Sequence, residues 1–291
     1  PPVPAIQERF LDVAELRLRE MDEAGVDIQV LSHAAPATQK LRADASVDLA
    51  RRVNDRLAAA IAEHPSRFAG FAALPTDDPA ASADELARCV EKLGFKGAML
   101  HGLANGAFLD EQRFWPIYAR AETLDVPIYL HPSRPHQGVI DVYYKEYVKE
   151  FPPILSAAWG FGVEAATQAV RMVLSGVFEK HPNLKFILGH LGEMIPFFLW
   201  RIDYSLRRPG AKPVNFREQF CRHFYVTTSG NFSDPALLCT ILEMGADRVL
   251  FSIDYPFVPN THGVQWLERT PISDEDKIKI ASGNAKRLLR M

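Results

Sequence analysis

Three successive apolar segments of this chain of 291 residues each close with a histidine. They end Met99-Leu100-His101, Tyr129-Leu130-His131 and Ile187-Leu188-Gly189-His190. A further apolar segment, residues 250–257, carries Asp254 among aliphatic and aromatic neighbours, so we expect its carboxylate to be largely buried. A lone buried carboxylate is costly unless it is paired or binds a metal, and neutral imidazoles with a carboxylate suit a divalent cation. The set therefore predicts a metal site.

The remaining histidines and the serines give weaker signals. His33 and His101 fit a structural role and a functional role equally well. No GxSxG motif is present, and Ser229 has no obvious base beside it in the sequence, so a serine nucleophile is poorly supported. We expect a structural role for four histidines that lie at helix ends, before a strand or in a loop: His64, His181, His223 and His262.

The elements that must position these residues follow from hydrophobic periodicity. Short segments rich in Val, Ile, Leu, Phe and Ala lack strict alternation, which is typical of buried parallel strands. Seven such strands are predicted, at residues 28–33, 67–75, 97–102, 127–132, 185–192, 224–230 and 249–257. Apolar residues at three- and four-residue spacing predict helices between them, among them residues 46–63, 79–93, 111–124 and 163–179.

Strands and helices alternate over the whole chain without a flexible linker, which indicates one α/β domain spanning residues 1–291. An open doubly wound sheet and a closed (β/α)8 barrel both fit this alternation. The glycine motifs GxGxxG and GxxxxGK[ST] are missing, which favours the barrel. In a parallel barrel the carboxyl ends of the strands converge on one face, where such enzymes place their chemistry.

Composition excludes several other classes of protein. The 33 Lys and Arg residues and 36 Asp and Glu residues are interspersed, with a net charge of −3, so no nucleic-acid or membrane partner is expected. No apolar run approaches the roughly 18 residues of a membrane span. The three cysteines, Cys89, Cys221 and Cys239, form no CxxC pair, so neither a disulfide framework nor a thiolate zinc site is expected. A reducing compartment fits best, and we expect the cytoplasm.

Five motifs of the chain are distinctive when taken together. They are Tyr129-Leu130-His131-Pro132, Gly189-His190-Leu191-Gly192-Glu193, Trp200-Arg201-Ile202-Asp203, Thr227-Thr228-Ser229-Gly230-Asn231-Phe232 and Phe251-Ser252-Ile253-Asp254-Tyr255-Pro256-Phe257. Together they resemble those of the amidohydrolase-related (amidohydrolase 2) decarboxylases, in the superfamily of aminocarboxymuconate-semialdehyde decarboxylase. Within it, the chain is most similar to the γ-resorcylate (2,6-dihydroxybenzoate) decarboxylases. The resemblance implies a distorted (β/α)8 barrel of the TIM type that binds one divalent metal ion, Zn or Mn, and no organic cofactor.

The resemblance also implies roles for individual residues. His131 and Asp254 would be metal ligands at the ends of the fifth and eighth barrel strands. His190 would act in acid/base chemistry, and Glu193 would set its protonation. Carboxylates commonly fix the tautomer of an imidazole in this way.

Arg201 matches an arginine that reaches the active site of a neighbouring subunit and contacts the substrate acid, which implies a homodimer or homotetramer. Alternatively, Arg201 is a surface residue paired with Asp203 or Glu193. The segment after His131 is rich in aromatic residues that could line a pocket, form a subunit interface or simply pack a long loop: Tyr143, Tyr144, Tyr147, Phe151, Trp159 and Phe161.

One feature of the family is missing from the start of the sequence. The first strand of the family carries a Glu-x-His or His-x-His pair that completes the metal site, and no such pair precedes Glu8. Residues 12–21 resemble the first helix that follows this strand. We therefore expect a barrel without its first strand and with an incomplete set of metal ligands.

The predicted function is metal-dependent, non-oxidative decarboxylation of a hydroxylated aromatic carboxylic acid, with release of CO2 and with Asp254 as the proton donor. A metal-dependent hydrolase of a lactone, ester or amide would use the same residues, with Asp254 taking a proton from metal-bound water. A non-catalytic barrel that has lost its metal is a third possibility. The motifs around Arg201 and Asp254 favour the decarboxylase.

Overall fold

Parallel strands and helices alternate along the computed structural model, which describes residues 4–210 and 212–291. Each of the seven predicted strands contains an observed one, and the second predicted strand is divided in two. The strands are β1 (Gln29–Leu31), β2 (Phe68–Gly70), β3 (Ala72–Ala73), β4 (Ala98–His101), β5 (Ile128–His131), β6 (Phe186–Leu188), β7 (Phe224–Thr227) and β8 (Val249–Leu250).

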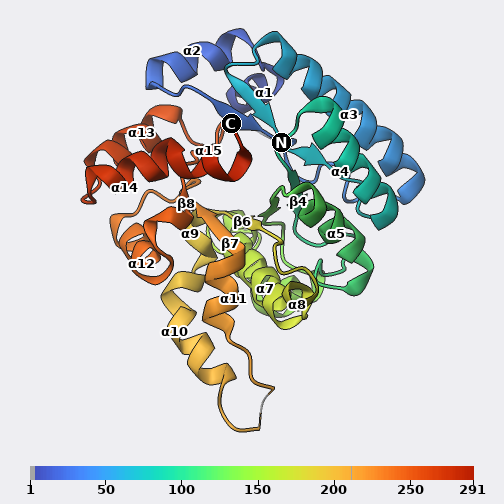
Figure 1. The fold of residues 1–291 in the computed structure, drawn as a ribbon, viewed down its shortest axis with the longest axis vertical. Coiled ribbons are helices and arrows are strands. Elements are labelled where there is room, and N and C mark those ends of the chain that lie inside the picture. Colours follow the sequence, from blue (N-terminus) through green and yellow to red (C-terminus); the bar gives the residue numbers. More distant parts are fainter. Residues whose placement is uncertain (1–3, 211) are drawn as a thin grey trace.

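The strands follow one another around the centre of the molecule, with helices outside them (Figure 1). β1 pairs with β2, and β3 to β8 pair in chain order, all in parallel. The chain changes partner at Phe71, whose N–H donates to Leu31 O at 2.8 Å, while the N–H of Ala72 donates to Gly97 O at 2.9 Å. Within the described ranges no ladder joins β8 to β1, so the barrel is open between these two strands.

All four predicted helices are present. α4 has the predicted bounds because Asp78 caps its first turn by accepting from Ala81 N, and Gly94, with φ of 72°, ends it. None of the helices in the described residues is long and apolar enough to cross a membrane. The α-helices of eight or more residues that follow β1 are α3 (Ala43–Glu63), α4 (Pro79–Leu93), α5 (Trp115–Leu124), α7 (Gly160–Leu174), α10 (Ile195–Leu206), α11 (Phe216–His223), α12 (Asp234–Met244) and α13 (Asn260–Arg269).

Before β1 the described residues form two helices, α1 and α2, and no strand. α2 overlaps the segment 12–21 that resembles the family's first helix. The remaining α-helices are α1 (Pro4–Leu11), α2 (Glu15–Ala24), α6 (Gln137–Val139), α8 (Val177–Lys180), α9 (His190–Glu193), α14 (Asp274–Ile278) and α15 (Asn284–Leu289).

Buried side chains divide into two layers because successive residues of a strand point to opposite faces. Leu100 and Leu130 belong to the large cluster that packs the strands against the helices. A second, smaller cluster contains Met99 and Tyr129, together with Leu288 of α15. Alternation then directs the residues two positions further along, His101 and His131, to the same inner side as this second cluster.

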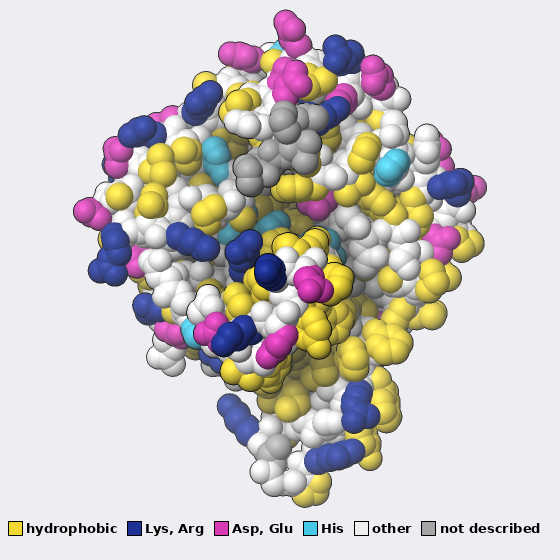
Figure 2. Space-filling view, turned by 180° about the vertical axis from the view of Figure 1, so that it is seen from behind, with side chains coloured by type: hydrophobic (Ala, Val, Ile, Leu, Met, Phe, Trp, Pro, Cys, Tyr) yellow, Lys and Arg dark blue, Asp and Glu magenta, His cyan; other side chains and the backbone are white. Residues whose placement is uncertain are grey.

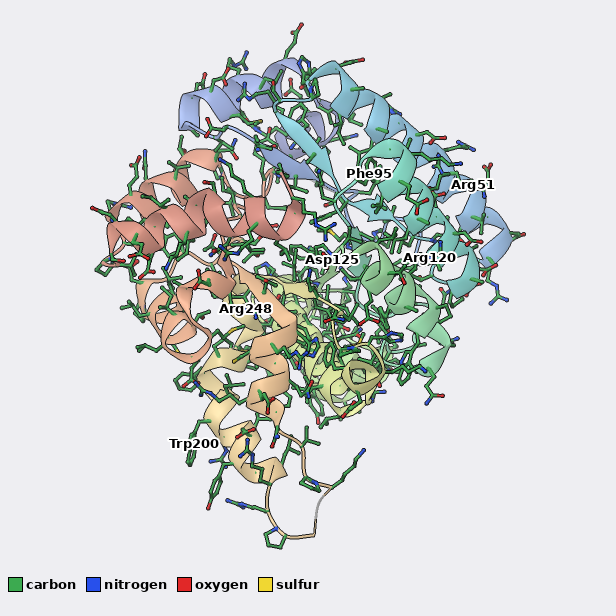
Figure 3. All side chains as sticks on the ribbon, viewed as in Figure 1. Arg51, Phe95, Arg120, Asp125, Trp200 and Arg248 are labelled. Atoms are coloured by element: carbon green, nitrogen blue, oxygen red, sulfur yellow. The ribbon has the colours of Figure 1, made fainter. Side chains whose placement is uncertain are left out.

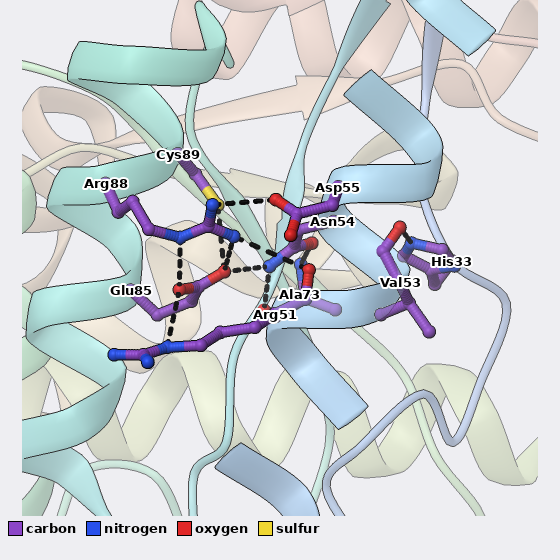
Figure 4. Close-up of polar contacts among 9 residues, drawn as sticks. All are labelled: His33, Arg51, Val53, Asn54, Asp55, Ala73, Glu85, Arg88 and Cys89. Carbon is purple, nitrogen blue, oxygen red and sulfur yellow. Dashed lines mark hydrogen bonds and ion pairs between the residues drawn. The ribbon is translucent and has the colours of Figure 1, made fainter. Parts of the chain in front are cut away.

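A polar network joins α3 and α4 to β3 (Figure 4). The side-chain amide of buried Asn54 donates to Ala73 O and accepts from Ala73 N, both at 2.9 Å. The same amide donates to Glu85 at 2.8 Å, and Glu85 accepts two hydrogen bonds from Arg88 at 2.8 Å. Asn54 thus satisfies the N–H and the carbonyl group of Ala73 in β3. This strand pairs with β4, whereas β2 just before it pairs with β1.

Candidate active site

The carboxyl ends of β5, β6 and β8 bring His131, His190 and Asp254 together, as the sequence predicts for the ends of parallel strands. The charges of the three side chains affect one another's pKa values. A Cβ atom placed on Gly230 would lie 3.2 Å from Asp254 Oδ2 and 3.7 Å from His190 Cδ2. Figure 2 shows histidine side chains within a central depression of one face of the molecule.

A left-handed turn holds His190 and Glu193. Five consecutive residues from His190 to Met194 have φ between 45° and 84°, and only Gly192 among them lacks a Cβ. Left-handed backbone costs other residues roughly 1–2 kcal/mol each, so the surrounding structure must stabilise this turn. Gly192 N donates to Gly189 O at 2.8 Å, and Leu191 is buried in the core. The sequence motif Gly189 to Glu193 identified the residues but did not predict this backbone.

The turn places the carboxylate of Glu193 on the imidazole of His190. His190 Nδ1 donates to Glu193 Oε1 at 2.6 Å, and Glu193 is buried. Burial by itself would lower the pKa of His190, but the hydrogen bond and the negative charges of Glu193 and Asp254 outweigh burial and raise it. Because Nδ1 is committed to Glu193, Nε2 is the nitrogen that can exchange a proton with a bound molecule.

His131 has the tautomer of a metal-binding imidazole. Its Nδ1 donates to Pro132 O at 2.7 Å, which leaves the lone pair of Nε2 available. Burial lowers the pKa of His131, although the Pro132 carbonyl and the charge of Asp254 oppose this effect. The lowered pKa favours the neutral ring, the form in which imidazole coordinates metals.

Asp254 has a strained backbone, with φ of +77°, and its carbonyl oxygen accepts from Phe257 N at 2.8 Å and Val258 N at 3.2 Å. Burial raises the pKa of its carboxyl group, while the positive charges of His190 and His131 oppose the increase. The carboxyl group is mostly buried, as expected from its apolar and aromatic neighbours, and it lies beyond the end of β8 at Leu250.

The donor chemistry of His131 and Asp254 fits a divalent metal ion, since one neutral imidazole nitrogen and one carboxylate are common ligands of Zn and Mn. In the part of the chain that the structure describes, no group of three or more His, Cys, Asp or Glu side chains could hold a metal.

Sequence reasoning missed Glu164, on α7. Its buried carboxyl group accepts from Ser133 N at 3.1 Å and from Gln168 Nε2 at 2.7 Å, so it fixes the segment that follows His131. Burial raises the pKa of Glu164 to about 7. No motif or periodicity distinguishes this glutamate from the other polar residues of its helix.

His101 also lies at this end of the barrel. Its ring contacts that of His131, with centroids 4.9 Å apart, and burial lowers its pKa to about 3. Of the histidines expected to be structural, His181 contacts Glu122 at 2.9 Å and His223 contacts Leu184 O at 2.7 Å.

Arg201 is not brought together with the other predicted site residues. It is exposed on α10, and it has no hydrogen bond or ion pair with the residues that the structure describes. Its suggested surface partner, Asp203, instead contacts Arg207 at 3.0 Å and accepts from Arg217 N at 3.0 Å. Neighbouring Trp200, which is 65% exposed, extends outward from the same helix (Figure 3).

Known proteins share both the sequence and the fold. The family model for amidohydrolases matches residues 4–291. The chain is 41% identical over 301 residues to a γ-resorcylate decarboxylase of Rhodococcus jostii (strain RHA1), covering 98% of this chain and 90% of the relative.

Two solved structures can be superposed on almost the whole chain. One is a dihydroxybenzoic acid decarboxylase of Polaromonas sp. JS666 with bound manganese and the inhibitor 2-nitroresorcinol. It has a TM-score of 0.93 and 42% identity and covers 99% of this chain and 89% of its own. The other is a 5-carboxyvanillate decarboxylase of Sphingomonas paucimobilis, with a TM-score of 0.92 and 38% identity, covering 100% of this chain and 87% of its own.

Proposed function

The chain belongs to the amidohydrolase family, and from its site we propose that it is a metal-dependent, non-oxidative decarboxylase of a hydroxylated aromatic carboxylic acid, a carboxy-lyase of the γ-resorcylate type. The observation that carries this proposal is the pair of His190 and Glu193, hydrogen-bonded at 2.6 Å beside His131 and Asp254. The choice of reaction is supported by relatives that match nearly the whole of this chain and are decarboxylases of dihydroxybenzoic acids.

Decarboxylation replaces the carboxylate on a ring carbon with a proton. The carbon–carbon bond breaks, its electron pair stays with the ring, and CO2 leaves. We assign the proton that is added to that carbon to the carboxyl group of Asp254, which lies with His190 beside Gly230. His190, with its raised pKa and its Nδ1 held by Glu193, exchanges protons with the site through Nε2.

His131 Nε2 and the Asp254 carboxylate are the residues of this chain that would hold the divalent ion, such as the manganese of the Polaromonas enzyme. When bound, the ion supplies positive charge that anchors an anionic substrate and stabilises charge that develops during the reaction. The hydrogen bond from His131 Nδ1 to Pro132 O keeps the ring oriented for this role.

The proposed substrate is a small aromatic carboxylic acid, and Arg201 is the proposed contact for its carboxylate across a subunit boundary. Guanidinium groups bind carboxylates through paired hydrogen bonds. Four aromatic residues on α10, the helix of Arg201, are exposed. Together they form an apolar surface of the kind that is buried in subunit interfaces. They are Phe197, Phe198, Trp200 and Tyr204. A homodimer or homotetramer would bury this helix and bring Arg201 to a partner's site.

Incubation of the manganese-loaded protein with a panel of hydroxybenzoates tests the proposal. We expect release of CO2 and formation of the corresponding phenol, with 2,6-dihydroxybenzoate among the substrates. The same preparation is also offered aromatic lactones and esters. Hydrolysis of a lactone or ester without release of CO2 from any hydroxybenzoate would replace the decarboxylase with a hydrolase of the same family.

A further inference from the structure

His101 Nδ1 and Gln39 Nε2 are among the buried side-chain atoms that have no hydrogen-bond partner in the described residues. His101 is 4% exposed and Gln39 is 1% exposed. An unsatisfied buried polar group typically costs about 1–3 kcal/mol, and native proteins keep few of them. The two residues are neighbours, because the side-chain oxygen of Gln39 accepts from the backbone N–H of His101. One small polar group that reaches both nitrogens would satisfy both.

His101 belongs to the same wall of the barrel as His131. The two residues are register partners on β4 and β5, and paired residues of neighbouring strands direct their side chains to the same face of a sheet. The contact between the two rings confirms this direction. His101 thus lies one strand away from a proposed metal ligand, on the face where the substrate would bind.

The hydrogen bonds of the two side chains determine what they can offer. His101 Nε2 lies 3.1 Å from His33 O, and because a carbonyl oxygen only accepts, Nε2 carries the proton and Nδ1 presents a lone pair. Gln39 Oε1 accepts from His101 N, which orients the amide and leaves its NH2 group as a donor. A hydrogen-bond acceptor and a hydrogen-bond donor therefore lie on two residues that are joined by a hydrogen bond.

We propose that His101 and Gln39 form a subsite for a hydroxyl group on the aromatic ring of the substrate. A hydroxyl group can donate to His101 Nδ1 and accept from Gln39 Nε2, so it satisfies both orphaned atoms. A methoxy oxygen only accepts, and a ring hydrogen does neither. This inference rests on the proposed decarboxylase function and adds to it a selection for the ring substituent.

Two substrates that differ by one ring hydroxyl provide the test: 2,6-dihydroxybenzoate and 2-hydroxybenzoate. The measured quantity is the ratio of their kcat/KM values in the manganese-loaded enzyme. A site that binds a hydroxyl through buried polar groups rejects the analogue that lacks it, so we expect the wild type to prefer the dihydroxy acid at least tenfold. His101→Phe keeps a flat ring and removes the acceptor, and it should reduce this ratio at least tenfold, mainly through loss of activity on the dihydroxy acid.

Gln39→Met is the second variant, since it removes the donor while leaving His101 in place. It should also reduce the ratio of the two kcat/KM values. The proposal therefore remains testable if His101→Phe fails to fold. His262→Phe, at an exposed position outside the site, is the control and should leave the ratio unchanged. An unchanged ratio in both site variants would overturn the subsite and would mean that the two atoms bind only a water molecule.

Binding measurements separate failure of the subsite from failure of the proposed function. Resorcinol and phenol, which also differ by one hydroxyl, are titrated into the wild type and both variants by calorimetry. If the wild type releases no CO2 from either acid, the decarboxylase proposal fails. A tenfold preference for resorcinol that disappears in His101→Phe would still support the subsite, and equal binding of both phenols by the wild type would reject it.

Discussion

Glu193 Oε1 lies 2.6 Å from His190 Nδ1 at the two ends of a single left-handed turn. The turn has support from outside itself: Asn231 Nδ2 donates to His190 O at 3.3 Å, and Thr240 Oγ1 donates to Leu191 O at 3.3 Å. Backbone strain of this kind persists where the surrounding structure stabilises it and is concentrated at functional sites. The proposed acid/base pair therefore depends on the segment after β7 and on α12 as well as on its own segment.

Glu193→Gln keeps the size of the side chain and removes its charge. Because the hydrogen bond and the negative charge of Glu193 raise the pKa of His190, His190 should lose its proton at a lower pH in the variant. We expect the limb of the kcat/KM profile that follows this deprotonation to move to lower pH, and kcat to fall roughly tenfold or more.

A pH profile from about 5 to 9 checks this prediction, with Glu179→Gln on the surface of α8 as the matched control. The control should reproduce the wild-type profile. A Glu193→Gln enzyme with an unshifted limb would show that Glu193 does not govern the protonation of His190.

His131→Ala and Asp254→Asn should each abolish activity and weaken metal binding, because each removes one of the two donors that this part of the chain contributes. Loss of a ligand from a small set should lower activity by roughly a thousandfold or more. Metal content after dialysis, measured by mass spectrometry, is the second readout. His64→Ala, at the end of α3, should retain both metal and activity, and full activity in either site variant would reject the assignment.

Arg201→Ala should lower kcat/KM by roughly 10- to 100-fold, the loss expected for a charge-assisted hydrogen bond to a carboxylate. Arg207→Ala, which removes a surface ion pair to Asp203, should have little effect. If Arg201 acts across an interface, subunits of Arg201→Ala mixed with subunits of His190→Ala should regain activity. In a twofold dimer, random mixing creates about a quarter of the wild-type sites.

Light scattering of the wild type accompanies the mixing experiment. We expect a dimer or a larger assembly that shifts to smaller species when Trp200 on the same helix is replaced by Lys. A fully active monomer, or mixed subunits that stay inactive, would remove Arg201 from the site.

The positions of the strands could be predicted from the sequence because buried parallel strands are apolar on both faces, but their lengths could not. Of the predicted strand 249–257, only Val249–Leu250 forms a strand, because the chain stops pairing with β7 before it reaches Asp254. The predicted strand 67–75 divides at Phe71, because its two halves pair with different neighbours. Pairing of this kind depends on contacts distant in sequence, which a local pattern does not record.

For the site, histidines at strand ends and the resemblance of motifs identified His131, His190 and Asp254. The left-handed turn at Glu193 and the buried carboxyl group of Glu164 could not be predicted, because they depend on tertiary contacts with Asn231 and Ser133. The sequence likewise left His101 undecided, since its significance depends on which of its two nitrogens has a partner.

His223 should make the stability of the fold depend on pH. Burial lowers the pKa of His223 below its ordinary value near 6.5, although the hydrogen bond to Leu184 O opposes this. The unfolded chain therefore binds a proton at this residue more readily than the folded chain does. The contribution of neutral His223 to the free energy of unfolding is fully present above about pH 6.5. It is lost as the pH falls toward the lowered pKa of the folded state. His223→Gln, which keeps a donor for Leu184 O, should reduce that loss.

Urea unfolding at about pH 5 and about pH 7.5 measures the effect, and His262→Gln at the surface is the control. The difference in the free energy of unfolding between the two pH values should be smaller in His223→Gln than in the control. Equal differences in the two variants would show that His223 does not contribute.

Asn54 should be among the most sensitive positions for stability, because one side chain satisfies Ala73 and Glu85 at once. Burial would raise the pKa of Glu85, but hydrogen bonds from Arg88, Asn54 and Cys89 outweigh burial and lower it, so the group is a buried anion (Figure 4). Asn54→Leu fills the same space and leaves the β3 backbone and one bond of this anion unsatisfied. We expect it to lower the free energy of unfolding by about 2–5 kcal/mol.

Asp55→Asn is the matched control on the next residue, since Asp55 contacts the same Arg88 at 2.7 Å but at the exposed rim of the network. An exposed ion pair contributes about 0–1 kcal/mol, so the control should unfold at nearly the wild-type urea concentration. Equal losses in the two variants would contradict the argument, because they would show that the charge around Arg88, rather than the amide that completes β3, stabilises this side of the barrel. A large loss of unfolding free energy in Asn54→Leu alone would support the argument that the Asn54 amide stabilises β3 by hydrogen-bonding to the backbone of Ala73.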